Sequence, residues 1–182
     1  MSRMAISANR RNRQLAQSIV ELAVATPVLI ALLLGAFDVG VMVSDKVIAG
    51  AACRQGARLA AEIGGQRTNP GMTQAQADAV VVRNVLAVAS AMNYSTIKFV
   101  YIYSPQQPDG DLHPGDPVDQ YDASGNPAGP QTFLFQNRNQ VPPNETMIGV
   151  RIEWTYNPPT GFSSFVVQLS EHTMFLASPV LP

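Results

Sequence analysis

The sequence has little of what identifies several common classes of protein. It contains a single cysteine, Cys53, so no disulfide bond can form within the chain. Cys53 lies among small residues on a predicted helix, which indicates a buried packing role rather than a reactive thiol. With a single cysteine, cysteine usage does not identify an oxidising compartment.

Charged residues make up only 14% of the chain, below the roughly 25% of an ordinary globular protein.

Positive charge is scarce outside the N-terminus. Residues 1–20 carry Arg3, Arg10, Arg11 and Arg13 and no acid, which leaves the remainder with more acidic than basic side chains. This distribution argues against nucleic-acid binding, which requires a basic surface. The arginines instead predict the cytoplasmic flank of a membrane helix.

The sequence also lacks the motifs of common enzyme classes. It contains no G-x-S-x-G, no H-E-x-x-H, no Walker loop and no G-x-G-x-x-G. The two histidines, His113 and His172, fall in a loop rich in proline and glycine and in a predicted strand. We therefore predict a protein that is not an enzyme and that carries no cofactor.

A long apolar run lies close to the basic N-terminus. No charged residue occurs between Leu22 and Phe37, and the flanking residues extend this run to a predicted membrane helix over 17–43. Its large side chains contribute around −5 kcal/mol to insertion, which exceeds the cost of about 2.5–3.5 kcal/mol for a carboxylate at the bilayer centre. A secretory signal would need a small-residue cleavage site shortly after the run, and none lies at the right distance. Pro27 removes one backbone hydrogen bond and predicts a kink.

The helical pattern continues beyond the membrane segment. Apolar and small residues recur at helical spacing on one face of residues 44–63: Ile48, Ala52, Gly56, Leu59 and Ile63. A helix from Gln17 to Ile63 would be about 70 Å long at 1.5 Å per residue, roughly twice a bilayer. Its second half is therefore expected to lie outside the membrane and to pack on other elements.

The rest of the chain predicts an α+β head over residues 44–182. Thr73 and Gln76 form a possible capping box before an amphipathic helix at 74–92. Strands are predicted at 97–103, 147–156 and 172–178, with clean alternation in the second of them. Strands joined by loops favour a small antiparallel sheet, which would pack against the helix at 44–63 and form a head on a helical stalk.

A long loop is predicted at 104–144, rich in proline, glycine, asparagine and glutamine. It contains five aspartates: Asp109, Asp111, Asp116, Asp119 and Asp122. Clustered aspartates could bind Ca²⁺, but their spacing does not match an EF-hand loop. A solvated acidic loop without a metal is the default interpretation, and a calcium site is the alternative.

Two stretches carry a family likeness. QSIVELAVATPVLIALLLGAFDVG and the downstream AGAACRQGARLAAEIGG resemble the TadE-like proteins, which are minor pilins or pseudopilins of the tight-adherence (Flp-type) pilus. The family pattern is a short basic leader, then Q-S-x-V-E-F, an apolar run with an internal proline, and an N-A-A-R-x-G-A-R-x-A-A helix. The likeness covers residues 13–65 and, more loosely, 147–178, where GVRIEWTYNPP and EHTMFLAS resemble the family's C-terminal part.

The resemblance implies processing by a prepilin peptidase on the cytoplasmic side. The cut would fall between Ala16 and Gln17, which makes residues 1–16 a leader and Glu21 the fifth residue of the mature chain. Pairing of Glu21 with the new α-amino group, in the same or a neighbouring subunit, would set the depth at which subunits stack. Alternatively, Glu21 lies in the headgroup layer. Ala16 stands where the family has glycine, and Leu22 stands where it has an aromatic residue.

The resemblance also implies a function. The expected protein is a membrane-anchored minor pilin-like subunit for assembly of a tight-adherence pilus, and hence for adhesion to surfaces. Expected partners are membrane lipid, other pilin-like subunits, pilus assembly proteins and the prepilin peptidase. The expected location is the bacterial inner membrane, with a single span, a cytoplasmic N-terminus and an extracytoplasmic head, or a surface pilus. One alternative is a single-span accessory subunit of another envelope complex, with an uncleaved anchor. Another is an extracytoplasmic module that binds Ca²⁺ or glycan through the aspartate loop.

Overall fold

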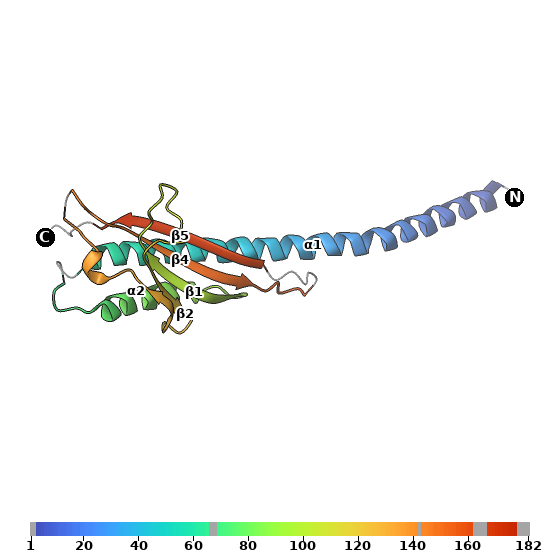
Figure 1. Cartoon of the computed structure of the whole chain (residues 1–182). Coiled ribbons are helices and arrows are strands. Elements are labelled where there is room, and N and C mark those ends of the chain that lie inside the picture. Colours follow the sequence, from blue (N-terminus) through green and yellow to red (C-terminus); the bar gives the residue numbers. More distant parts are fainter. Residues whose placement is uncertain (1–2, 66–68, 142, 162–166, 178–182) are drawn as a thin grey trace.

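The protein consists of one very long helix, a second helix and one sheet (Figure 1). The computed structural model describes residues 3–65, 69–141, 143–161 and 167–177, with side chains from Gln17 onward. The elements are, in chain order, α1 (Arg3–Ile63), α2 (Gln74–Ala89), β1 (Ser95–Tyr103), β2 (Val118–Asp122), β3 (Pro127–Gln131), the 3-10 helix η1 (Phe135–Asn137), β4 (Met147–Tyr156) and β5 (Val167–Leu176). The predicted α+β class is confirmed.

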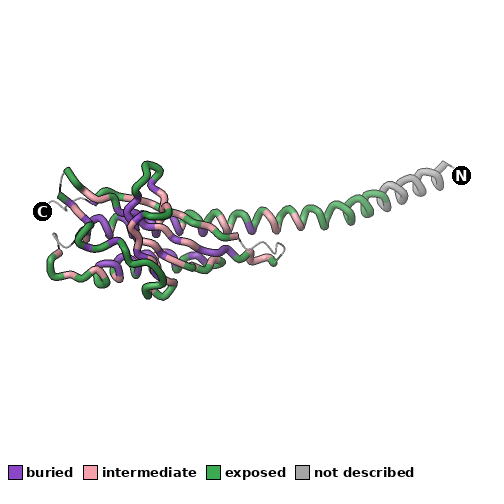
Figure 2. Tube along the Cα trace, viewed as in Figure 1, coloured by how far each residue is buried: buried purple, intermediate pink, exposed green. Residues whose placement is uncertain are grey.

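α1 runs without interruption through the apolar segment and into the head. It continues across Pro27, and the Thr26 hydroxyl donates a hydrogen bond to the Leu22 carbonyl at 2.7 Å. The continuous helix predicted from Gln17 to Ile63 is confirmed, whereas a kink at Pro27 stays a prediction. The N-terminal half of α1 projects far beyond the sheet (Figure 1), and its residues from Gln17 onward are exposed almost throughout (Figure 2).

The sheet is fully antiparallel, with the strand order β3-β2-β1-β4-β5. β4 occupies the interior of the sheet and has the bounds predicted from its sequence. Successive side chains of a strand point to opposite faces. The predicted inner face of β4 is buried at every position: Ile148, Val150, Ile152, Trp154 and Tyr156.

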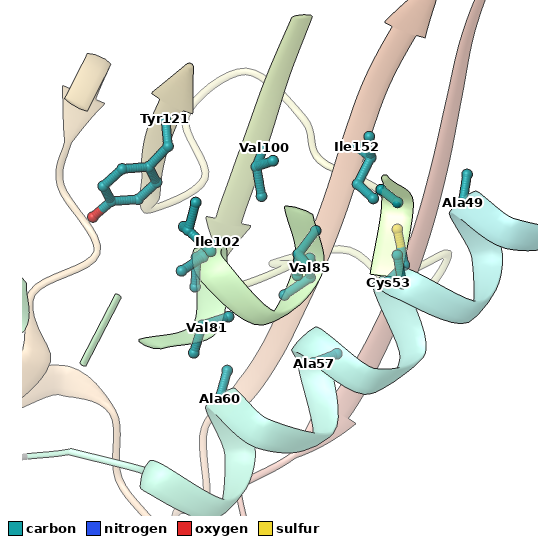
Figure 3. Packing of buried hydrophobic residues seen from close by; sticks show 14 of the residues in the cluster. Ala49, Cys53, Ala57, Ala60, Val81, Val85, Val100, Ile102, Tyr121 and Ile152 are labelled. Carbon is teal, nitrogen blue, oxygen red and sulfur yellow. The ribbon is translucent and has the colours of Figure 1, made fainter. Parts of the chain in front are cut away.

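Both helices pack on the same face of the sheet (Figure 3). α1 contributes small residues and α2 contributes valines to one buried cluster with the inner side chains of the strands. The α1 residues of this cluster are Ala49, Ala52, Cys53, Ala57 and Ala60. Such small side chains allow the helix axis to approach the sheet and α2 closely. Residues on the predicted apolar face, such as Ile48 and Leu59, lie at the border of this contact and are half-buried.

Cys53 has the packing role that the sequence indicates. Its thiol is fully buried and donates to the Glu171 carbonyl at 3.2 Å. Burial raises the pKa of the Cys53 thiol to about 12, so the reactive thiolate is not populated near neutral pH.

α1 approaches α2 closely at Gly56. A Cβ atom added at this position would collide with Cγ2 of Val85, a fully buried residue of α2. We expect Gly56→Ala to destabilise the head by about 1–3 kcal/mol, because the two helices would have to move apart in a filled core. The urea midpoint of the full chain in micelles measures the effect. Gly71→Ala is the control, since that position has open space around it; equal midpoints for the two variants would contradict the packing.

The segment 104–144 differs from the long loop predicted for it. It contains β2, β3 and η1, and β2 pairs with β1 over Val118–Asp122. The inner side chains of β2 are Asp119 and Tyr121, so the strand lacks the apolar alternation by which strands are recognised. Two smaller corrections concern the other elements: α2 ends at Ala89 rather than at residue 92, and the last strand begins at Val167 rather than at His172.

Polar side chains on the inner face of β2, toward α2, form a buried ionic cluster. Arg138 donates to Asp78 of α2 at 2.5 Å and to Asp119 of β2 at 2.9 Å, and all three residues are buried. The Tyr121 hydroxyl also donates to Asp78, at 2.7 Å. The Arg138 guanidinium carbon lies 4.6 Å from the centre of the Phe133 ring, which covers it. The cluster therefore joins α2, β2 and the segment after β3.

Two carboxylates share one guanidinium in this cluster. Burial, together with the nearby Asp78 charge, raises the pKa of Asp119 to about 6. Removal of a single partner would leave a charge in the protein interior without its counterion, which is much more costly than the loss of an exposed pair. The cluster thus makes the position of β2 and β3 depend on Arg138.

Candidate membrane and assembly site

The free arm of α1 (Gln17–Phe37) presents its large apolar side chains to the surroundings. These side chains are between 51% and 70% exposed: Ile19, Val20, Leu22, Val24, Val28, Leu29, Ile30, Leu32, Leu33 and Phe37. At 1.5 Å per residue the arm is about 31 Å long, and the hydrocarbon core of a bilayer is about 30 Å thick. Among the described helices, α1 is the one with the length and composition to cross a membrane. The arm therefore has the length and surface of a single membrane span.

Asp38 marks the point at which the head begins. The Tyr156 hydroxyl donates to the Asp38 carbonyl at 2.7 Å, and the Thr160 hydroxyl donates to the Asp38 carboxylate at 2.6 Å. Two turns further along α1, Asp45 accepts a hydrogen bond from the Ser95 hydroxyl at 2.6 Å. Both aspartates are buried, and their hydrogen bonds offset the cost of that burial. These contacts fix the end of the sheet nearest the arm to α1.

The spacing of residues in α1 is a sequence signal for the contacts of Asp38 and Asp45 with the head. Asp38, Asp45 and Ala52 follow one another at intervals of seven residues, so they lie on the same face of α1. Ala52 belongs to the face predicted to pack on the sheet. From the sequence alone, Asp38 falls inside the predicted membrane segment 17–43, because its partners in the head lie more than a hundred residues further along the chain.

Glu21 lies in the first part of the arm and is exposed. The Gln17 side-chain amide donates to the Glu21 carboxylate at 2.9 Å, one helical turn away. The helix passes through Ala16 and Gln17 without a break. Processing at Ala16–Gln17 and an assembly role for Glu21 stay predictions, while the geometry shows that residue 17 and Glu21 are neighbours.

Each of the five predicted loop aspartates has partners within the protein. Asp109 pairs with His113 at 2.8 Å, and this hydrogen bond holds the pKa of Asp109 below its usual value. Asp111 pairs with Arg151 at 3.0 Å, and Asp119 belongs to the buried cluster. Asp116 and Asp122 accept hydrogen bonds from backbone amides within their own turns. Within the described ranges, no group of three or more His, Cys, Asp or Glu side chains could hold a metal ion. In these ranges the aspartates therefore stabilise local structure. The calcium alternative lacks a cluster of ligands among the described residues.

An apolar N-terminal helix, half free and half packed into an α+β head, defines the structural class of the chain. Residues 16–58 match the model of the TadE family, described as TadE-like protein. The match begins at Ala16, at the predicted processing site, and ends within the part of α1 that packs on the head. No curated protein and no solved structure matches the chain. The TadE-like family is a structural family associated with the Tad pilus, in agreement with the resemblance found in the sequence.

Proposed function

We propose that this protein is a membrane-anchored minor pilin-like subunit that takes part in assembly of a tight-adherence pilus and thereby in surface attachment. The main support for this proposal is the structure of the free arm of α1. It is apolar, exposed and as long as a bilayer is thick, and it lies within the segment that matches the TadE-like family. A soluble protein would have to keep this surface in water at a large free-energy cost.

The arm would cross the inner membrane with the arginine-rich N-terminus in the cytoplasm. The head would then begin at Asp38 on the extracytoplasmic side. This boundary is a few residues earlier than the predicted end of the span at residue 43. The reason is that Val41 and Met42 already pack against the core and Asp38 is held by polar groups of the head.

Glu21 would serve as the docking charge during assembly. A carboxylate inside a bilayer requires a partner, and in the uncleaved chain the Gln17 amide is a neutral one. Cleavage before Gln17 by a prepilin peptidase would create a cationic α-amino group about one turn away. That cation could pair with Glu21 in the same subunit or in a neighbouring one, which would align subunits at a common depth.

We expect Glu21→Ala to insert and fold normally but to lose co-purification with the other pilus components by at least about tenfold, which corresponds to ~1.4 kcal/mol. Glu21→Gln preserves the shape and removes the charge, so it should behave like Glu21→Ala. Glu62→Ala is the matched control, because Glu62 is an exposed carboxylate on the head half of α1. Quantitative pull-down from solubilised membranes gives the measurement. If Glu21→Ala co-purified with the other pilus components at the wild-type level, the assembly role of Glu21 would be excluded. The role of the arm as a membrane anchor would not be affected by that result.

One observation favours the alternative of an accessory subunit with an uncleaved anchor. α1 is helical on both sides of the Ala16–Gln17 bond, so a peptidase would have to open the helix before cutting. In that alternative, the arginines would remain as a permanent cytoplasmic flank. The mature N-terminus distinguishes the two possibilities.

A further inference from the structure

The sheet has a second face, opposite the two helices, which a loop covers in part. Segment 104–117 folds back over this face beside Tyr103. The Tyr103 hydroxyl donates to the Gly110 carbonyl at 2.7 Å, and Arg151 of β4 holds Asp111 at 3.0 Å. The Tyr103 ring lies against Gly149, where a Cβ atom would be 2.5 Å from the ring. These contacts give the segment a fixed position on the sheet.

Beside this segment the same face contains a cleft of about 360 Å³. Residues 112–116 form one wall and Pro130 of β3 forms another. The floor consists of side chains from three neighbouring strands: Tyr101, Gln120, Arg151 and Glu153. The cleft is shallow and open to solvent, and its volume lies near the lower end of the range of about 300–1,000 Å³ that is typical of small-molecule sites.

The floor combines an aromatic ring with fixed polar groups. The Glu153 carboxylate accepts hydrogen bonds from the Tyr101 hydroxyl and from Arg151, both at 3.1 Å, which sets its orientation. Burial and the Glu153 charge raise the pKa of Tyr101 to about 12, so its hydroxyl remains neutral. The Gln120 side-chain amide makes no hydrogen bond to any residue that the structure describes, and it is half-buried in the floor. Gln120 therefore offers one donor group and one acceptor that are available to a ligand.

The charge of the cleft restricts the class of ligand. The lining contains the carboxylates of Glu153 and Asp116, the guanidinium of Arg151 and the imidazole of His113, which pairs with Asp109; this balance offers no excess of positive charge to an anionic ligand. Donors and acceptors lie side by side around the edge of an aromatic ring. A sugar has the complementary arrangement, because its C–H face is apolar and its hydroxyl groups both donate and accept. We propose that this cleft binds a neutral saccharide, with the sugar ring on Tyr101 and its hydroxyl groups on Gln120 and Glu153.

Saturation-transfer NMR on the full chain tests this site. The chain is held in lipid nanodiscs, because sugar-based detergents would compete, and the probes are the methyl glycosides of glucose, galactose and N-acetylglucosamine. At least one glycoside is expected to bind, and Gln120→Ala and Glu153→Gln are each expected to weaken its binding at least about tenfold. Gln136→Ala, at an exposed glutamine of η1 outside the cleft, should bind like the wild type.

Two results would overturn the assignment. One is the absence of saturation transfer to all three glycosides by the wild type. The other is transfer that is equally strong in wild type, Gln120→Ala and Glu153→Gln, which would place the sugar elsewhere. Because both cleft variants alter partly exposed side chains, far-UV circular dichroism can verify that each remains folded. Neither outcome depends on whether the chain assembles into a pilus.

Discussion

Arg138→Met is expected to destabilise the head by about 3–5 kcal/mol, enough to unfold much of it. Arg138 is the cation that contacts both Asp78 and Asp119, and all three side chains are buried. Methionine fills a similar volume but leaves two carboxylates without their counterion in the interior. The loss should be cooperative, since the cluster links α2 to β2 and to the segment after β3.

Urea unfolding of the full chain in micelles measures this loss. The fluorescence of Trp154 is a convenient signal, because this single tryptophan is buried in β4. Arg83→Met, at an exposed arginine of α2, is the control and should stay within about 0.5 kcal/mol of wild type. Addition of Asp78→Asn and Asp119→Asn to the Arg138 variant should recover part of the loss. Equal midpoints for Arg138→Met and Arg83→Met would show that the cluster contributes little.

Ile30→Lys is expected to reduce membrane insertion of the chain by roughly 100-fold. Ile30 lies in the inner part of the free arm and is 51% exposed. A lysine near the bilayer centre costs about 2.5–3.5 kcal/mol, and together with the cost of Glu21 this cancels most of the roughly −5 kcal/mol contributed by the apolar residues, so the inserted fraction should fall. The fraction of the protein that resists extraction from membranes by alkaline carbonate measures the change.

Val47→Lys is the matched control for this experiment. Val47 is apolar, 62% exposed and on the same helix, but it lies on the head side of Asp38. We expect Val47→Lys to remain in the membrane like the wild type. Val43→Lys tests the boundary, because a span that ends at Phe37 tolerates this change better than one that extends to residue 43. Full retention of Ile30→Lys would show that the arm is not the span.

Elements with strong periodicity could be predicted from the sequence. β4 alternates over its whole length, α1 carries a long apolar run followed by a helical stripe, and Thr73 and Gln76 form the predicted capping box at the start of α2. In each case the information lies within a few neighbouring residues. Local patterns of this kind are the ones that sequence reasoning detects well.

Contacts between distant polar residues could not be predicted. β2 buries Asp119 and Tyr121, whose partners Asp78 and Arg138 lie in other elements. Without knowledge of these partners, the sequence predicts a solvated loop for the aspartate-rich segment 104–144. The sequence alone places Asp38 inside the predicted membrane segment 17–43 for the same reason, since its partners Tyr156 and Thr160 are near the other end of the chain. A buried charge becomes recognisable only when its counterpart is placed beside it.

The N-terminal residue of the mature protein tests the proposed function most directly. The protein is isolated from membranes of its native host, and intact mass and N-terminal sequencing are determined. A pilin-like subunit is expected to begin at Gln17, with residues 1–16 removed and a free α-amino group one turn from Glu21. A mature chain that retains Arg10, Arg11 and Arg13 would contradict pilin processing and would support a permanent, uncleaved anchor.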